Sequence, residues 1–229
     1  MKPVALIPAR GGSKRLPRKN ILDFLGRPLI AWPISRALES GVFSRVIVST
    51  DDSEIASVAL SYGAEVINRP DELAQDRSTV VDVCQHALEQ MRLGDNPVDD
   101  LCCIYATAAL ITVSDILESY DTLRLGMYDS VMGVSDYELS PLQALEQVDG
   151  AWRMRWPEFK SVQSQFFPDL VCSCGMLYWI KADSLLSGRN FYTDRMGIYR
   201  IPRYRVCDIN TKEDFQLAET KAKVLWGAI

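Results

Sequence analysis

The sequence predicts an α/β protein with a mostly parallel, Rossmann-like sheet and helices on both of its faces. Short apolar runs alternate with amphipathic segments of helical length between residues 4 and 134, and this alternation is typical of parallel sheets. The run at residues 101–105 is apolar throughout, as expected for a central strand buried on both faces. A chain of 229 residues that is 48% hydrophobic is long enough to bury such a core. We therefore expect residues 1–229 to form one domain.

Each predicted element has a local reason in the sequence. Strands are expected at the apolar runs, namely residues 4–8, 46–48, 65–68, 101–105, 130–134 and 176–180, with 199–206 also extended. Helices are expected at the amphipathic runs, namely residues 28–40, 53–62, 79–92, 112–126 and 211–225. Aspartate precedes the second helix, and Thr-x-x-Asp opens the last two, so these three helices carry start signals. Gly63 ends the second helix.

The strand-helix rhythm breaks at residues 135–168. This segment is rich in Pro, Gln, aromatic and charged residues, and we interpret it as an arm with a hairpin near residues 147–154. An exposed arm that carries several Leu, Trp and Phe side chains is a liability for a monomer. We therefore expect the arm to pack on a second copy in a homodimer. The alternative is that it folds back over its own sheet.

Composition excludes several classes of protein. The net charge of −5 argues against a general nucleic-acid binder. No apolar run approaches the length of a membrane helix and no signal peptide is evident, so we expect a cytoplasmic protein without membrane contact. Six cysteines form no zinc pattern and fit a reducing compartment. His86 is the one histidine, which leaves no basis for a histidine-activated nucleophile.

A basic loop follows the first strand. Five cations, Arg10, Lys14, Arg15, Arg18 and Lys19, surround the pair Gly11-Gly12. Glycine lets backbone N–H groups approach a ligand closely, and clustered cations favour a phosphate chain. The spacing matches neither the P-loop nor the dinucleotide fingerprint. A solvated basic turn is the alternative, but we expect a phosphate site in which Lys19 is solvent-accessible.

Other polar segments also follow strands. Residues 49–51, 105–107 and 208–210 lie where carboxyl ends of strands are expected, so they are predicted to converge with the basic loop. Phosphate-binding cations beside oxygen ligands suit a nucleoside triphosphate with Mg²⁺. Asp208 and Asn210 alternate in an extended segment and can face one ion. Alternatively, Asn210 or Thr211 caps the last helix.

The loop LIPARGGSKRLPRKN resembles the signature loop of the sugar-activating cytidylyltransferases. From residue 3 to about 221, the chain is similar to the acylneuraminate cytidylyltransferase family, and nearest to its pseudaminic acid branch. This resemblance implies a fold of the nucleotide-diphospho-sugar transferase type and a homodimer that depends on Mg²⁺. It also implies transfer of CMP from CTP to a nine-carbon α-keto acid sugar, pseudaminic acid first, with release of pyrophosphate, for surface glycan or flagellin glycosylation.

The candidate site residues fall into four groups. The catalytic candidates are Lys19, Arg10 and Asp208. The nucleotide-binding candidates are Arg10, Gly11, Gly12, Ser13, Lys14, Lys19, Asn20, Ser78 and Tyr105. The metal candidates are Asp208 and Asn210. The sugar-binding candidates are Gln143, Ser164 and Gln165.

The chain departs from the family pattern at several positions. Asn210 stands where the family usually has aspartate, and Ala106 and Ala109 stand where this branch has prolines. The triplet at residues 172–174 reads Cys-Ser-Cys instead of His-Asp-Ala, and Gln163 replaces a frequent arginine. The alternatives are therefore the same reaction on N-acetylneuraminate, legionaminate or an octulosonate, or a nucleotide-binding protein without catalysis.

Overall fold

The computed structural model describes residues 3–93 and 98–227, so the ends of the predicted domain, residues 1–2 and 228–229, lie outside the described part. Its main sheet contains β1 (Val4–Pro8), β4 (Arg45–Thr50), β5 (Glu65–Asn68), β6 (Asp100–Ile104), β7 (Ser130–Asp136), β10 (Val171–Lys181) and β11 (Met196–Arg200). Two hairpins contain β2 (Asp23–Phe24) with β3 (Arg27–Pro28), and β8 (Leu145–Val148) with β9 (Ala151–Met154). The helices are α1 (Ala31–Glu39), α2 (Ser53–Ser61), α3 (Val80–Leu93), α4 (Val113–Arg124), α5 (Ala182–Leu186) and α6 (Lys212–Trp226).

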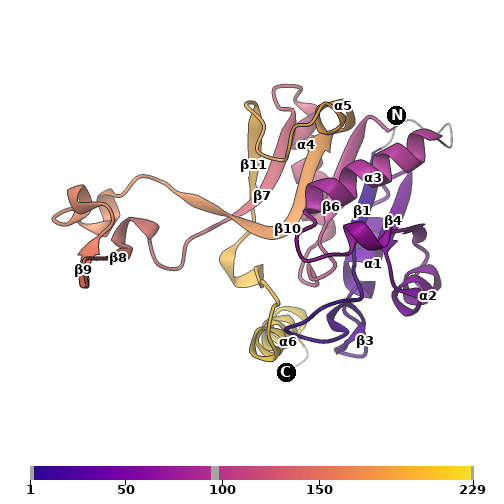
Figure 1. Cartoon of the computed structure of the whole chain (residues 1–229), viewed down its shortest axis with the longest axis horizontal. Helices are drawn as coiled ribbons and strands as arrows, with labels where there is room; N and C mark the ends of the chain where they lie inside the picture. The colour runs from indigo at the N-terminus through magenta and orange to yellow at the C-terminus, as the bar shows by residue number, and fades with distance from the viewer. Residues whose placement is uncertain (1–2, 94–97, 228–229) are drawn as a thin grey trace.

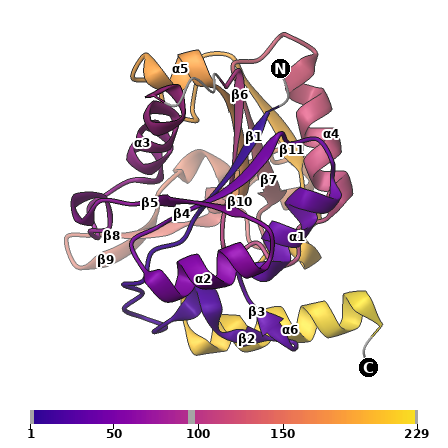
Figure 2. The ribbon, with the colours of Figure 1, turned by 90° about the vertical axis from the view of Figure 1, so that its right-hand side faces the viewer.

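The strands of the main sheet lie in the order β11-β7-β10-β6-β1-β4-β5 (Figures 1 and 2). Neighbouring strands are parallel except at β10, which runs antiparallel to both β6 and β7. The predicted mostly parallel α/β sheet is confirmed. The apolar strand β6 lies in the middle of the sheet, as its composition predicted.

Strand β1 shows why both faces of the sheet are covered. Val4 and Leu6 join a core cluster with residues of α3 and α5, whereas Ala5 and Ile7 join a second cluster with residues of α1, α2 and α4. Alternate side chains of a strand point to opposite faces, so an uninterrupted apolar run is required here. A third cluster, with Phe24 and Phe215, packs α6 against the β2–β3 hairpin.

The three predicted helix start signals are confirmed. Asp52 accepts hydrogen bonds from the N–H groups of Glu54 and Ile55 at the start of α2. Thr112 and Thr211 form capping boxes with the third residues of α4 and α6. The last helix is therefore capped by Thr211 rather than by Asn210, and the side chain of Asn210 is available for other contacts.

Three elements have boundaries that differ from the prediction. The helix predicted from residue 28 begins at Ala31, because Leu25 and Gly26 both adopt positive φ and turn the chain into the β2–β3 hairpin. The extended segment predicted at 199–206 ends at Arg200 and continues as a 3₁₀ turn at Arg203–Arg205. Strand β10 begins at Val171, five residues earlier than expected, where it pairs with the end of β7.

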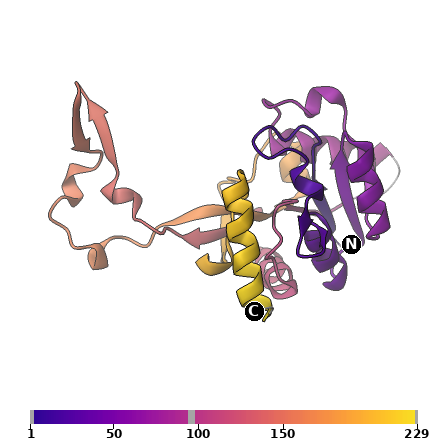
Figure 3. The ribbon, with the colours of Figure 1, turned by 90° about the horizontal axis from the view of Figure 1, so that it is seen from below.

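The segment between β7 and β10 forms an arm that projects away from the sheet (Figures 1 and 3). Its β8–β9 hairpin lies where a hairpin was expected and turns at Asp149 and Gly150, both with positive φ, which suits a two-residue hairpin loop. The arm does not fold back over its own sheet, so that alternative is wrong. The division into a single domain stays a prediction.

Candidate active site

A basic cavity of about 520 Å³ opens beside the carboxyl end of β1. Because β1 has β4 on one side and β6 on the other, chain segments that leave the sheet in opposite directions meet here, as is usual for ligand sites in open α/β sheets. Of the predicted residues, the cavity brings together Arg10, Ser13, Lys14, Lys19, Asn20, Ser78, Tyr105 and Asn210. Gly11, Gly12 and Asp208 do not line it.

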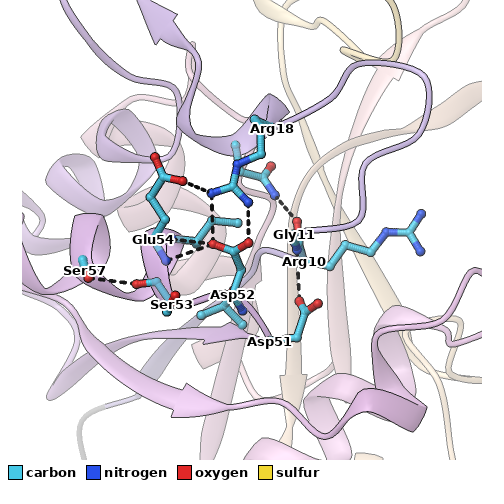
Figure 4. Close-up of polar contacts among 11 residues, drawn as sticks. Arg10, Gly11, Arg18, Asp51, Asp52, Ser53, Glu54 and Ser57 are labelled. Atoms are coloured by element: carbon cyan, nitrogen blue, oxygen red, sulfur yellow. Dashed lines mark hydrogen bonds and ion pairs between the residues drawn. The ribbon is translucent and has the colours of Figure 1, made fainter.

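Gly11 has a structural contact that the sequence did not reveal. Its N–H donates to Oδ1 of Asp51 at 3.0 Å (Figure 4), so in this structure that group is not offered to a ligand. A Cβ at this position would lie 2.6 Å from Oδ2 of Asp52. Glycine is therefore required because the loop passes directly over the aspartates that follow β4.

Arg18 turns away from the cavity. Its guanidinium pairs with Asp52 and Glu54 at the start of α2, and Figure 4 shows the side chain of Arg10 pointing elsewhere. The hydrogen bond from Arg18 holds the pKa of Asp52 below its ordinary value. Four of the five cations of the loop, Arg10, Lys14, Arg15 and Lys19, line the cavity, and the fifth fastens the loop to α2.

Asp76 lies between two of these cations. Its carboxylate pairs with Arg10 at 2.9 Å and with Lys14 at 2.6 Å. The hydrogen bonds from Lys14 and Arg10 lower the pKa of Asp76. The carboxylate of Asp76 thus serves as counter-ion to the two side chains that were assigned to phosphate.

Lys19 is half-buried, contrary to the expectation of a solvent-accessible lysine. Its Nζ donates to the backbone carbonyl of Ile209 at 2.5 Å. Burial lowers the pKa of Lys19, and the nearby charge of Asp208 opposes this effect. The loop after β1 is therefore joined directly to the segment that precedes α6.

Asp208 and Asn210 lie together, as their spacing predicted. Nδ2 of Asn210 donates to Oδ2 of Asp208 at 2.7 Å. The amide oxygen of Asn210, however, accepts a 2.7 Å hydrogen bond from Arg15, so it does not face a site shared with Asp208. Within residues 3–93 and 98–227, no group of three or more His, Cys, Asp or Glu side chains is placed to hold a metal ion.

A second cavity of about 410 Å³, the thiol cavity, adjoins the first at Tyr105. Its wall includes Cys172, Cys174 and Asp208. Burial raises the pKa of Cys174 to about 11, so that side chain is a neutral thiol near neutral pH. Tyr178 and Ser173, also in the wall, share a 2.6 Å hydrogen bond. A strongly basic cavity therefore lies beside one whose wall carries both acidic and basic side chains.

The three predicted sugar-binding residues are not at either cavity. Gln143, Ser164 and Gln165 lie on the arm, and Ser164 lines a separate hollow of about 370 Å³. The sequence placed them near the sugar, but a single chain does not bring them there, because the arm projects outward.

Arg69 lines the basic cavity and was missing from the predicted site. It is buried, and it donates to the backbone oxygen of Ser49 at 2.6 Å and to the hydroxyl of Ser49 at 3.3 Å. Burial lowers the pKa of Arg69. The available signal was an Arg-Pro pair directly after a strand, on the side of the sheet where the loops converge.

Comparisons with solved structures agree with this fold. The structure of CMP:2-keto-3-deoxy-manno-octonic acid synthetase complexed with CTP is similar, with a TM-score of 0.72 at 17% identity over 99% of this chain and 100% of that one. The structure of 4-diphosphocytidyl-2C-methyl-D-erythritol synthase from Anaerococcus prevotii gives a TM-score of 0.68 at 11% identity over 97% and 99% of the two chains. At these identities the likeness shows the fold alone.

Sequence comparisons identify the family. Pseudaminic acid cytidylyltransferase from Campylobacter jejuni subsp. jejuni serotype O:23/36 is 34% identical over 98% of this chain and 97% of its own length. N-acylneuraminate cytidylyltransferase from Streptococcus agalactiae serotype III is 30% identical over 94% of this chain and 52% of its own. A family model for cytidylyltransferases matches residues 4–157, from β1 with its basic loop to the arm. With a match over most of the sheet and a relative aligned almost from end to end, the chain belongs to the cytidylyltransferase family.

Proposed function

We propose that this protein transfers CMP from CTP to a nine-carbon α-keto acid sugar, pseudaminic acid first, and releases pyrophosphate. The observation that carries this proposal is the pairing of the basic cavity with the thiol cavity across Tyr105. The basic cavity suits a triphosphate, and the thiol cavity suits the sugar that accepts CMP. The Campylobacter relative, named for pseudaminic acid, supports the choice of sugar. A cytoplasmic location fits six free cysteines.

The basic cavity supplies the nucleotide site. Arg10 and Lys14 bind phosphate oxygens in exchange for Asp76, and Lys19 stabilises the charge that shifts at the α-phosphate during transfer. Asn20 is buried and donates to the backbone oxygen of Arg10 at 3.0 Å, so it holds the loop in position. Ser78 and Tyr105 complete the walls.

The sugar in the thiol cavity attacks through its anomeric hydroxyl, in line with the departing pyrophosphate. Asp208 lies in the wall of this cavity, and one exposed carboxylate beside substrate phosphates is a common way for proteins to hold Mg²⁺. A bound Mg²⁺ supplies charge neutralisation at the phosphates and a lower pKa for the hydroxyl. Asn210 would be a second ligand only if its amide oxygen were released from Arg15.

The arm completes the site in a homodimer. Its exposed apolar side chains include Leu139, Leu145, Trp152 and Phe166, which need a partner surface. A second copy on this arm brings Gln143, Ser164 and Gln165 toward the partner's sugar. The sugar-binding role of these residues thus depends on the dimer.

The proposal is tested by measuring the release of pyrophosphate from CTP in the presence of Mg²⁺ and an acceptor sugar. The acceptors are pseudaminic acid, N-acetylneuraminate, legionaminate and an octulosonate, and we expect the highest kcat/KM with pseudaminic acid. A higher value with another acid reassigns the substrate within the same reaction. CTP binding without turnover of any acceptor contradicts the proposal in favour of a non-catalytic nucleotide-binding protein.

The metal proposal has its own prediction. Asp208→Ala should abolish Mg²⁺-dependent turnover and weaken Mg²⁺ binding in calorimetric titrations with CTP present, because a charged oxygen ligand is lost. Asn210→Asp should keep activity and tighten Mg²⁺ binding. Unchanged Mg²⁺ affinity in the Asn210→Asp protein would contradict a role of Asn210 as a metal ligand. Its role would then be limited to the hydrogen bonds with Arg15 and Asp208.

A further inference from the structure

The acceptor of the proposed reaction carries a carboxylate, and this charge needs a cation in the cavity that receives it. Within the described part of the chain, the thiol cavity has two basic residues in its wall, Arg203 and Lys221. Lys221 donates its Nζ to the backbone oxygen of Val206 at 2.9 Å. This contact uses one of the three donors of the ammonium group, and the remaining donors do not form the parallel pair that a guanidinium offers to a carboxylate.

Arg203 differs from its neighbouring arginines. Arg200 pairs with Asp136 at 3.3 Å and with Asp169 at 2.7 Å, and Arg205 pairs with the buried Asp115. Among residues 3–93 and 98–227, no carboxylate pairs with Arg203 and no hydrogen bond engages its side chain. One of three closely spaced arginines therefore lines the cavity with its guanidinium unpaired.

The backbone around Arg203 is fixed from both sides. Ile201 donates its N–H to the oxygen of Val134, and the N–H of Val206 donates to the oxygen of Arg203 itself. Figures 1 and 3 show this segment, between β11 and α6, beside the base of the arm. A cation on a fixed turn is a better anchor than one on a mobile loop, because less entropy is lost on binding.

Three acidic side chains lie in the same wall, Asp136, Glu138 and Asp208. Glu138 is exposed, and within the described residues it makes no ion pair with Arg203. Asp136 is held by Arg200, and Asp208 accepts from Asn210. A guanidinium can donate two parallel hydrogen bonds to a carboxylate, a geometry that a lysine does not reproduce. The arm does not supply an arginine at residue 163, because that residue is a glutamine.

We propose that Arg203 binds the carboxylate of the acid sugar and so selects α-keto acids over neutral sugars. The inference rests on the proposed function, since it assigns one contact of the acceptor. Arg203 acts in ground-state binding of the sugar. Its loss therefore raises the KM for the sugar and leaves the KM for CTP unchanged.

The test compares Arg203→Gln with wild type, using pseudaminic acid and its carboxamide as acceptors. Loss of a charged hydrogen bond should raise the KM for the acid roughly 10- to 100-fold. The carboxamide should give equal KM values with both proteins, because the charge that Arg203 recognises is absent. Arg203→Lys should recover part of the affinity for the acid. Arg189→Gln, next to Asp129 where β7 begins, is the matched control and should behave as wild type.

Two outcomes distinguish a failure of the role assigned to Arg203 from a failure of the proposed function. A wild-type protein that is active, beside an Arg203→Gln protein whose KM for the acid is within twofold of wild type, overturns the role of Arg203 alone. Absence of turnover by wild type contradicts the proposed function. Calorimetric titration of pseudaminic acid then still decides the inference, because equal affinities of the two proteins contradict it and a weaker Arg203→Gln protein supports it.

Discussion

At the scale of single residues, Gly11 illustrates how the basic loop depends on a close approach between segments. Gly11 and Gly12 are neighbours in a glycine pair, but only Gly11 lies against the aspartates after β4. A side chain at Gly12 would meet nothing within 4 Å. The two glycines therefore have different roles although the sequence presents them as a unit.

Gly11→Ala should displace Asp52, because a Cβ there would lie 2.6 Å from Oδ2. Asp52 caps α2 and binds Arg18, and loss of such a cap costs about 0.5–2 kcal/mol. Chemical denaturation should show this loss of stability together with weaker CTP binding. Gly12→Ala is the control. Equal stabilities for the two variants would contradict the role assigned to Gly11.

Lys19 should limit activity at alkaline pH. Burial lowers its pKa below the ordinary 10.5, so the free enzyme loses the required ammonium as pH rises through that lowered value. Activity is therefore retained at pH values below the lowered pKa of Lys19 and falls at pH values above it. We expect kcat/KM for CTP to decline on this alkaline limb, and Lys19→Arg to move the decline to higher pH, since guanidinium stays charged.

Lys19→Ala should lower kcat by on the order of 10²-fold or more while the protein remains folded. Far-ultraviolet circular dichroism checks the fold, and steady-state kinetics check the rate. Lys14→Ala, which removes an exposed cation, should mainly raise the KM for CTP. Wild-type turnover by folded Lys19→Ala protein would remove Lys19 from the catalytic group.

At the scale of elements, one ion pair fastens the segment before α6 to the start of α4. Asp115 is fully buried and accepts hydrogen bonds from Arg205, Thr112 and Tyr199. Burial alone would raise the pKa of Asp115, but the bonds from Arg205 and Thr112 outweigh it and leave the pKa below its ordinary value. Its stabilising contribution is therefore present above the unfolded-state pKa and is lost as pH falls through the folded-state pKa.

Arg205→Ala should destabilise the protein by about 3–5 kcal/mol at pH 7, because it leaves a buried carboxylate without its cation. Urea denaturation measures the change. Arg200→Ala is the control, since its partners Asp136 and Asp169 are exposed and such pairs contribute about 0–1 kcal/mol. A similar small loss in both variants would show that the Asp115 pair is not the anchor.

At the scale of the whole molecule, the arm should decide the oligomeric state. Trp152 is 68% exposed on β9, and a charge at a buried interface is costly. Trp152→Glu should shift the protein toward monomer in light scattering, and activity should fall with it. Leu60→Glu, on α2 with a side chain 60% exposed, should remain like wild type. Wild-type protein that is monomeric and fully active at micromolar concentration would contradict the dimer requirement.

Local signals in the sequence determined much of the fold. The apolar run of β1, the Thr-x-x-Asp starts of α4 and α6 and the order of strands and helices depend on residues close together in the chain. The basic loop after β1 likewise pointed to a phosphate site, because a strand end is a predictable place for a ligand. The β2–β3 hairpin was missed, since Leu25 adopts a positive φ that a leucine rarely takes.

Only the tertiary structure decided how the cations of the loop are used. Arg18 pairs with Asp52, 34 residues away, and Lys19 binds a carbonyl 190 residues away. Such contacts depend on strand order and on the path of loops between strands, which local propensity does not encode. The same reason applies to the orientation of Asn210 toward Arg15 and to the outward direction of the arm. Much of the lining of the basic cavity was thus predicted from the sequence, whereas Arg69 was missed and the partners of the lining residues were set by the packing of distant segments.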